Sequence, residues 1–102
     1  YLSKEMWRTA MAITIEAPAT PFSNRFTALD SLLAEQVCAL ITGLQTRGIV
    51  RPDIDPAAMG EVIFNNLNMM FIEFVKDDAM ALTALNANVA RQNAQLAKLL
   101  TR

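Results

Sequence analysis

This chain of 102 residues contains no histidine, one cysteine, three glycines and four prolines. Without histidine, the commonest general base and metal ligand is missing, and Cys38 has no imidazole partner to activate it as a nucleophile. No glycine-rich phosphate loop and no metal-type spacing of carboxylates is present. The aspartates at 53, 55, 77 and 78 fall in expected connectors, where capping is their usual role. We therefore expect no enzyme, no metal site and no cofactor.

Charge of either sign is also scarce. The chain carries 9 basic and 10 acidic side chains, a formal net charge of −1 and a pI of about 5.2. DNA-binding domains usually have a basic face or a pI above about 9, so this segment is not expected to contact DNA itself. The longest uncharged run of the expected third helix, 62–72, is shorter than the ~20 residues of a membrane span. A single cysteine and no visible signal peptide favour the cytoplasm and no membrane contact.

What the chain has in abundance is apolar residues at helical spacing. The apolar share is 53%, and the spacing predicts helices over 2–16, 23–47, 56–76 and 80–100. Pro18 and Pro21 end the first helix, and Asp78 is the expected N-cap of the fourth. Short connectors make consecutive helices antiparallel. The expected fold is one all-α domain over 1–102, an antiparallel bundle of about four helices.

The connector between the second and third helices, R-G-I-V-R-P-D-I-D-P at 47–56, is the most specific motif. Gly48 suits the left-handed position that ends a helix, Asp55 can cap the next helix, and Pro56 suits its first turn. The pattern G-x-[IV]-R-P-D-x-D-P followed by an apolar helix resembles the C-terminal regulatory domain of TetR-family transcriptional regulators. The resemblance is best over 32–75 and looser to residue 100.

This resemblance implies an effector-binding and dimerisation domain. In that family the helices enclose a small-molecule pocket, and the last two helices form a four-helix bundle with their copies across a two-fold axis. The family's N-terminal helix-turn-helix has no counterpart here, and the chain opens at Tyr1 rather than at methionine. We therefore expect part of a longer homodimeric regulator, most simply a repressor, which contacts DNA only through an N-terminal domain absent from this chain.

Bulky apolar side chains of the first and third helices are the candidates for lining a pocket. Such pockets are mostly apolar, with a few polar groups that orient the ligand. The alternative is that these residues form an ordinary core. No lysine or arginine falls on the apolar arcs and Glu73 borders one of them, so we expect a mainly apolar effector that is uncharged or cationic. The candidates are Met6, Trp7, Met11, Phe64, Leu67, Phe71 and Phe74.

A second, narrower apolar strip on the third helix is the candidate dimer seam. Asn66 and Glu73 separate it from the main arc, and polar groups on an apolar seam often determine register or partner choice. The alternative is that both face solvent beside the core. With the fourth helix included, the interface candidates are Val62, Asn66, Met69, Glu73, Val89 and Leu96.

Cys38 falls opposite the leucine stripe of the second helix, near Ser31, Glu35 and Thr42. We interpret it as a partly exposed small filler residue, with a redox switch as the alternative.

Two readings of function from different classes remain open beside the sensor domain. One is a helical homodimerisation or protein-interaction module without an effector, in which the aromatic residues pack into a solid core. The other is a small-molecule enzyme of a bundle fold, which the missing catalytic residue types disfavour. A cavity of several hundred cubic ångströms, the usual size of a ligand site, distinguishes the sensor from the interaction module.

Overall fold

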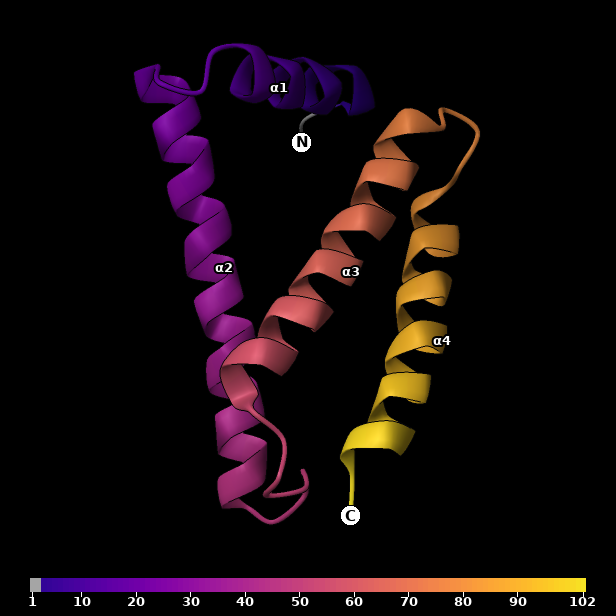
Figure 1. The fold of residues 1–102 in the computed structure, drawn as a ribbon. Helices are drawn as coiled ribbons and strands as arrows, with labels where there is room; N and C mark the ends of the chain where they lie inside the picture. The colour runs from indigo at the N-terminus through magenta and orange to yellow at the C-terminus, as the bar shows by residue number, and fades with distance from the viewer. Residues whose placement is uncertain (1–2) are drawn as a thin grey trace.

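The computed structural model describes residues 3–102, and four α-helices joined by short connectors make up this part of the chain (Figure 1). The all-α prediction is confirmed. The predicted ends of the helices differ from the observed ones by two residues or fewer, and the predicted start of the first helix at residue 2 lies outside the described residues. The four helices are α1 (Lys4–Glu16), α2 (Pro21–Thr46), α3 (Pro56–Lys76) and α4 (Leu82–Leu100).

The helices form an open bundle. α2 and α3 meet near the connector that joins them and diverge towards their other ends, so that they form a V (Figure 1). α4 runs beside α3 on the side away from α2, and α1 lies across the open end of the V, where it packs on both α2 and α3. The crosswise position of α1 departs from the antiparallel arrangement expected for every consecutive pair.

Local sequence signals account for most helix ends. Gly48 has a φ of 77° at the end of α2, as predicted. The Asp55 carboxylate accepts hydrogen bonds from the backbone N–H groups of Ala57 and Ala58, at 3.0 and 3.4 Å, which confirms it as the cap of α3. Thr20 caps α2 in the same way, by accepting a hydrogen bond from the N–H of Ser23.

The predicted cap of the fourth helix is wrong. α4 begins at Leu82, and its N-cap is Ala81, whose side chain makes no capping hydrogen bond. Asp78 instead forms an ion pair with Arg8 of α1, at 3.0 Å. Asp77 accepts a hydrogen bond from the N–H of Ala79 and so stabilises the turn between α3 and α4. A contact between segments 70 residues apart therefore replaces a local cap.

A small buried core lies where α2, the connector and the end of α4 meet. Ile41, Val50 and Leu100 are each 5% exposed or less. The half-buried side chains of Leu44, Ile54, Met59 and Ile63 pack against them.

Backbone pairing reinforces this core. The N–H of Arg51 donates a hydrogen bond to the carbonyl of Leu100 at 2.8 Å, and Val50 forms an isolated antiparallel bridge with Thr101. The Arg51 guanidinium also binds the Asp53 carboxylate, which holds the pKa of that carboxyl below its usual range. The sequence pattern did not predict the backbone pairing of residues 50 and 51 with residues 100 and 101, because it joins segments about 50 residues apart through backbone groups.

A close approach between α2 and α3 involves Cys38 and Gly60. A Cβ atom at Gly60 would lie 2.3 Å from the Cys38 Sγ atom and 3.0 Å from its Cα atom. The two helices can therefore approach this closely only because residue 60 has no side chain. Cys38 lies opposite the leucine stripe by helical spacing, and α3 covers part of that side, because its thiol lies against Gly60 and the carbonyl of Ala57. Its partial exposure is confirmed.

One helix has the length and apolar composition of a membrane span. The sequence analysis expected no membrane span because the uncharged run 62–72 in α3 is too short. In α2, however, an 18-residue window has the mean hydropathy and the low charge of a span. Only 6% of that window is buried within the chain. This is weak evidence for a membrane, because core helices of globular proteins also meet these criteria. Part of the exposed apolar surface of α2 lines the cavities described below.

Candidate functional site

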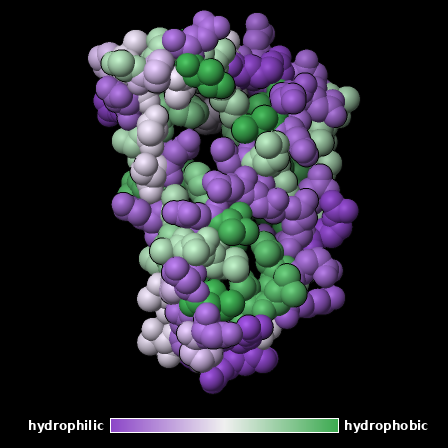
Figure 2. Space-filling model, viewed as in Figure 1, coloured by the Kyte–Doolittle hydropathy of each residue, from purple (hydrophilic) through white to green (hydrophobic). Residues whose placement is uncertain are grey.

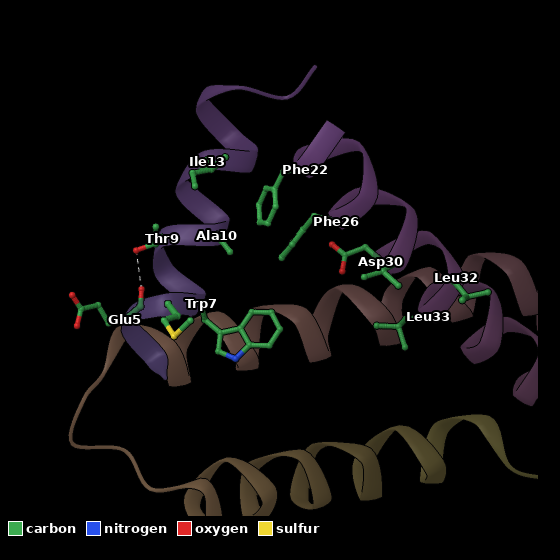
Figure 3. Close-up of a pocket in the computed structure, with 12 residues that line it drawn as sticks. Glu5, Trp7, Thr9, Ala10, Ile13, Phe22, Phe26, Asp30, Leu32 and Leu33 are labelled. Carbon is green, nitrogen blue, oxygen red and sulfur yellow. Dashed lines mark hydrogen bonds between the residues drawn. The ribbon is translucent and has the colours of Figure 1, made fainter. Parts of the chain in front are cut away.

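Two apolar cavities lie at the open end of the V. The first, of about 730 Å³, lies between α1 and the N-terminal half of α2 (Figure 3). The second, of about 570 Å³, lies between α1, α2 and α3. Figure 2 shows the molecule hollowed beneath α1 in this region. The cavities exist because α2 and α3 diverge and α1 spans the opening without filling it.

The structure brings most of the pocket candidates together. Five of them line the second cavity, and Met6 lines the first. Phe74 lines neither: its ring lies 6.3 Å from that of Phe71 and beneath the Lys4 Nζ atom, 4.0 Å from the ring centroid. The five residues of the second cavity are Trp7, Met11, Phe64, Leu67 and Phe71.

Four residues line both cavities and form a shared wall, namely Trp7, Phe26, Asp30 and Leu33. The Trp7 ring meets Phe71 edge-on at a centroid distance of 5.2 Å, and Phe26 at 6.4 Å. These are favourable aromatic geometries, so the indole is held in place by one ring from α2 and one from α3. The shared wall is therefore ordered, although it borders open space.

The pocket candidates named from the sequence lack the contribution of α2. Phe26, Leu29, Leu33 and Leu40 belong to the apolar stripe of this helix, a pattern that ordinarily indicates core. Leu29, Leu33 and Leu40 are nevertheless 51–61% exposed, and each lines a cavity. The length of α2 is the sequence feature that could have indicated a role of these residues in a cavity. A crossing helix covers only part of a 26-residue helix, so the remaining apolar positions stay uncovered.

The charge on the cavity walls comes from residues that the sequence did not single out. Asp30 lines both cavities and Glu5 lines the first, and neither lining includes a lysine or an arginine. Burial raises the pKa of Asp30 above its ordinary value. Glu73 was one of the two reasons to expect an uncharged or cationic effector, beside the absence of lysine and arginine from the apolar arcs, but it is exposed and lines neither cavity. The acidic group of the site is thus Asp30 on α2.

Two basic side chains attach α1 to the end of α3. The Lys4 ammonium donates hydrogen bonds to the carbonyls of Asp77 and Met80, at 2.5 and 2.6 Å. The Arg8 guanidinium donates to the carbonyl of Val75 at 2.6 Å and to Asp78. Cations are favourable at a helix C-terminus, where carbonyl groups lack partners. These contacts hold α1 against the end of α3, where it forms one wall of the cavities.

A separate groove of about 370 Å³ lies between α3 and α4. It includes three of the interface candidates, Val62, Asn66 and Leu96, together with Leu99 and two glutamines. Hydrophobic atoms gather over this part of α3 and α4 in the lower half of Figure 2. The remaining candidates lie outside the groove: Met69 and Glu73 are exposed, and Val89 is half-buried.

Asn66 has a partner within the chain. Its amide Nδ2 atom donates a hydrogen bond of 2.7 Å to the Gln92 Oε1 atom of α4, and its side chain is half-buried. This contact joins α3 and α4 along the candidate seam. The alternative of a solvent-facing residue thus describes Glu73 but not Asn66.

The arrangement is suited to binding an apolar molecule. Among residues 3–102, no group of three histidine, cysteine, aspartate or glutamate side chains could hold a metal ion. Comparison with known protein families, curated proteins and solved structures gave no match for this chain. The family resemblance therefore stays a prediction, and the cavities and the groove are the features of the molecule that bear on its function.

Proposed function

We propose that this chain is the effector-sensing and dimerisation domain of a TetR-like transcriptional regulator, and that it binds a mainly apolar small molecule between α1, α2 and α3. The observation that carries the proposal is the pair of cavities of about 730 and 570 Å³ with a shared aromatic wall. Ligand sites usually measure about 300–1,000 Å³ and are lined in this way. A module without an effector predicts instead that the aromatic residues fill this space.

The contacts of α1 suggest how a ligand would be sensed. A ligand against Trp7 would touch α1 and α3 together, while Lys4 and Arg8 tie α1 to the end of α3. A molecule that fits better when α1 is displaced would favour that displaced state, since a ligand shifts an equilibrium only through different affinities for the two states. Displacement of α1 would alter the spacing of DNA-reading domains that precede it in a dimer. In a repressor this change weakens operator binding.

The α3–α4 groove is the proposed dimer seam. Val62 and Leu99 line it and are 53% and 67% exposed, and Met69, on the same helix as Val62, is 54% exposed. A second copy of the chain, related by a two-fold axis, would cover the same groove on both subunits, which is the commonest geometry of homo-oligomers. The Asn66–Gln92 pair would then lie on the seam and restrict its register.

The cavity can be tested with N-phenyl-1-naphthylamine, a neutral apolar fluorescent probe. Trp7→Ala should weaken its binding roughly tenfold or more, because a large apolar contact is lost. The matched control is Ile15→Ala on the same helix, since Ile15 is 79% exposed and lines neither cavity. If Trp7→Ala leaves binding unchanged and only lowers the free energy of unfolding, by about 3–5 kcal/mol as for a core aromatic, Trp7 belongs to the core and the cavity proposal fails.

The seam can be tested by native mass spectrometry of the chain. The combined substitution Asn66→Leu with Glu73→Leu should change the stability or geometry of the dimer, because it removes the polar groups beside the seam. Glu61→Leu, at an exposed position of α3 outside the groove, is the matched control and should leave association unchanged. Equal association of both variants would remove the polar-seam idea, and a monomer at micromolar concentration would contradict the seam itself.

A further inference from the structure

We infer that the cavities select organic cations with an apolar body, and that the Asp30 carboxylate is the group that recognises the positive charge. The inference rests on the proposed function, because it names the class of ligand for the same cavities. It concerns one side chain of α2 that lines both cavities beside Trp7, Phe26 and Leu33 (Figure 3).

The Asp30 carboxylate is placed where a ligand would meet it. Within residues 3–102, no hydrogen bond or ion pair links it to another side chain, and Figure 3 shows it beside Phe26 on the side of α2 that borders the first cavity. A carboxylate among apolar side chains loses part of its hydration. The raised pKa of Asp30 is the expected consequence of this loss. A bound cation would restore a favourable environment for the charge.

The surrounding charges favour a cation over an anion. The first cavity contains Glu5 and Asp30, the second contains Asp30 alone, and neither contains a basic side chain. The nearest basic residues on α1, Lys4 and Arg8, are engaged at the end of α3. An anionic ligand would therefore meet one or two carboxylates without a compensating cation.

The aromatic residues of the shared wall add a second reason. A positive charge near the face of a tryptophan or phenylalanine ring is attracted by the π-electron density of that ring. Trp7 and Phe26 line both cavities together with Asp30, so a quaternary or primary ammonium beside the carboxylate would be close to both rings. The apolar body of the same ligand would occupy the space between Leu33, Phe64 and Phe71.

Three dansyl compounds of similar size separate charge from apolar contact. Dansylcadaverine carries a primary ammonium, its N-acetyl derivative is neutral, and dansyl-aminohexanoic acid carries a carboxylate. Binding can be followed by energy transfer from Trp7, because it is the single tryptophan of the chain. We expect the cation to bind about five- to tenfold more tightly than the neutral compound, as for a charge-assisted contact at a half-buried site, and the anion to bind most weakly.

Matched variants assign the preference to one residue. Asp30→Asn should bind the cationic and neutral compounds equally, and Asp30→Lys should shift the preference to the anion. Glu35→Gln removes the same charge from an exposed position of α2 that lines neither cavity, so it should keep the preference of the unsubstituted chain. Circular dichroism confirms that each variant is helical before binding is measured.

The outcomes separate this inference from the proposed function. Equal binding of the cationic and neutral compounds by the unsubstituted chain, or an undiminished preference in Asp30→Asn, would overturn the role of Asp30 while the cavity still binds an apolar molecule. Binding of none of the three compounds would contradict the cavity itself, and the inference with it.

Discussion

The two ends of the α2–α3 pair use similar residues in opposite ways. At the crossing end, Ile41 of α2 is 4% exposed and belongs to the buried core. Nearer the open end, Leu33 is 51% exposed and lines both cavities, and Leu40, which precedes Ile41 but points to another side of α2, is 61% exposed and lines the second cavity. One helix therefore supplies both core residues and cavity walls, according to position along the helix and side, so apolar character alone does not reveal which role a residue has.

The contrast follows from how the two helices meet. Gly60 and Cys38 allow a close approach at one point, and the helices diverge from it, so the space between them widens towards α1 (Figure 1). Side chains fill the narrow part, whereas in the wide part they reach only its walls. We therefore expect substitutions of the side chains that fill the narrow part to change stability and substitutions of the cavity-lining side chains to change binding.

The largest effect on stability should come from truncating Ile41, the buried residue of the adjacent pair Leu40 and Ile41. Ile41→Ala should lower the free energy of unfolding by about 2–5 kcal/mol, as is usual for a large-to-small change in a core. Leu40→Ala, at the next position, should change it by less than about 0.5 kcal/mol, as at exposed sites, and weaken probe binding instead. Urea unfolding monitored by circular dichroism measures both values. Equal losses would show that the Leu40 side chain is packed in solution and does not border open space.

A smaller but more specific effect is expected at the crossing point. Gly60→Ala places a methyl group against Cys38, and overpacking of this kind costs about 1–3 kcal/mol. The higher helix propensity of alanine offsets up to about 1 kcal/mol of this cost, so the protein should lose stability. Gly43→Ala on α2 is the matched control, because nothing lies within 4 Å of the added Cβ atom, and it should gain about 0.5–1 kcal/mol.

A double substitution tests whether the Gly60→Ala loss arises at this contact. Cys38→Ala removes the sulfur atom nearest to the new methyl group, so it should restore part of the stability in the Gly60→Ala background. Additive effects of the two changes, measured in a double-mutant cycle, would contradict the close contact.

The smallest effect concerns the charge at the open end. Burial raises the pKa of Asp30 above its ordinary value of 3.8, so the folded state favours the protonated carboxyl, and ionisation at neutral pH costs some stability. Asp30→Asn should therefore slightly raise the midpoint of thermal unfolding at neutral pH. The gain should shrink as the pH falls through the raised pKa and disappear below pH 3.8.

The groups around Asp30 bear on this result. Glu5 faces the first cavity from α1, and α3 contributes Asn68 but no titratable side chain to the lining of the second. Glu5→Gln serves as the comparison, because Glu5 lines the first cavity but is exposed, and this substitution should not reproduce the gain expected from Asp30→Asn. A gain from Asp30→Asn that does not vary with pH would contradict a raised pKa.

The helices and most of their ends could be predicted well from the sequence. Helix-period spacing predicted the four helices, and the positions of Gly48 and Asp55 predicted the end of α2 and the start of α3. These signals act over a few residues, so the surrounding fold does not alter them. Asp78 shows the limit of such signals. It was predicted to cap α4, but it forms an ion pair with Arg8 of α1 instead.

The sequence by itself determined an all-α chain, the positions of its connectors and an excess of apolar positions over what four helices can bury. Only the tertiary structure decided where that excess lies: a close approach at Gly60, the divergence of α2 from α3, and the position of α1 across the opening. The same arrangement of the helices places Asp30 in the cavity wall and Leu40 beside open space. The physical reason is that helical periodicity determines the direction of a side chain around its own axis, whereas crossing angles and separations between helices determine whether anything lies in that direction.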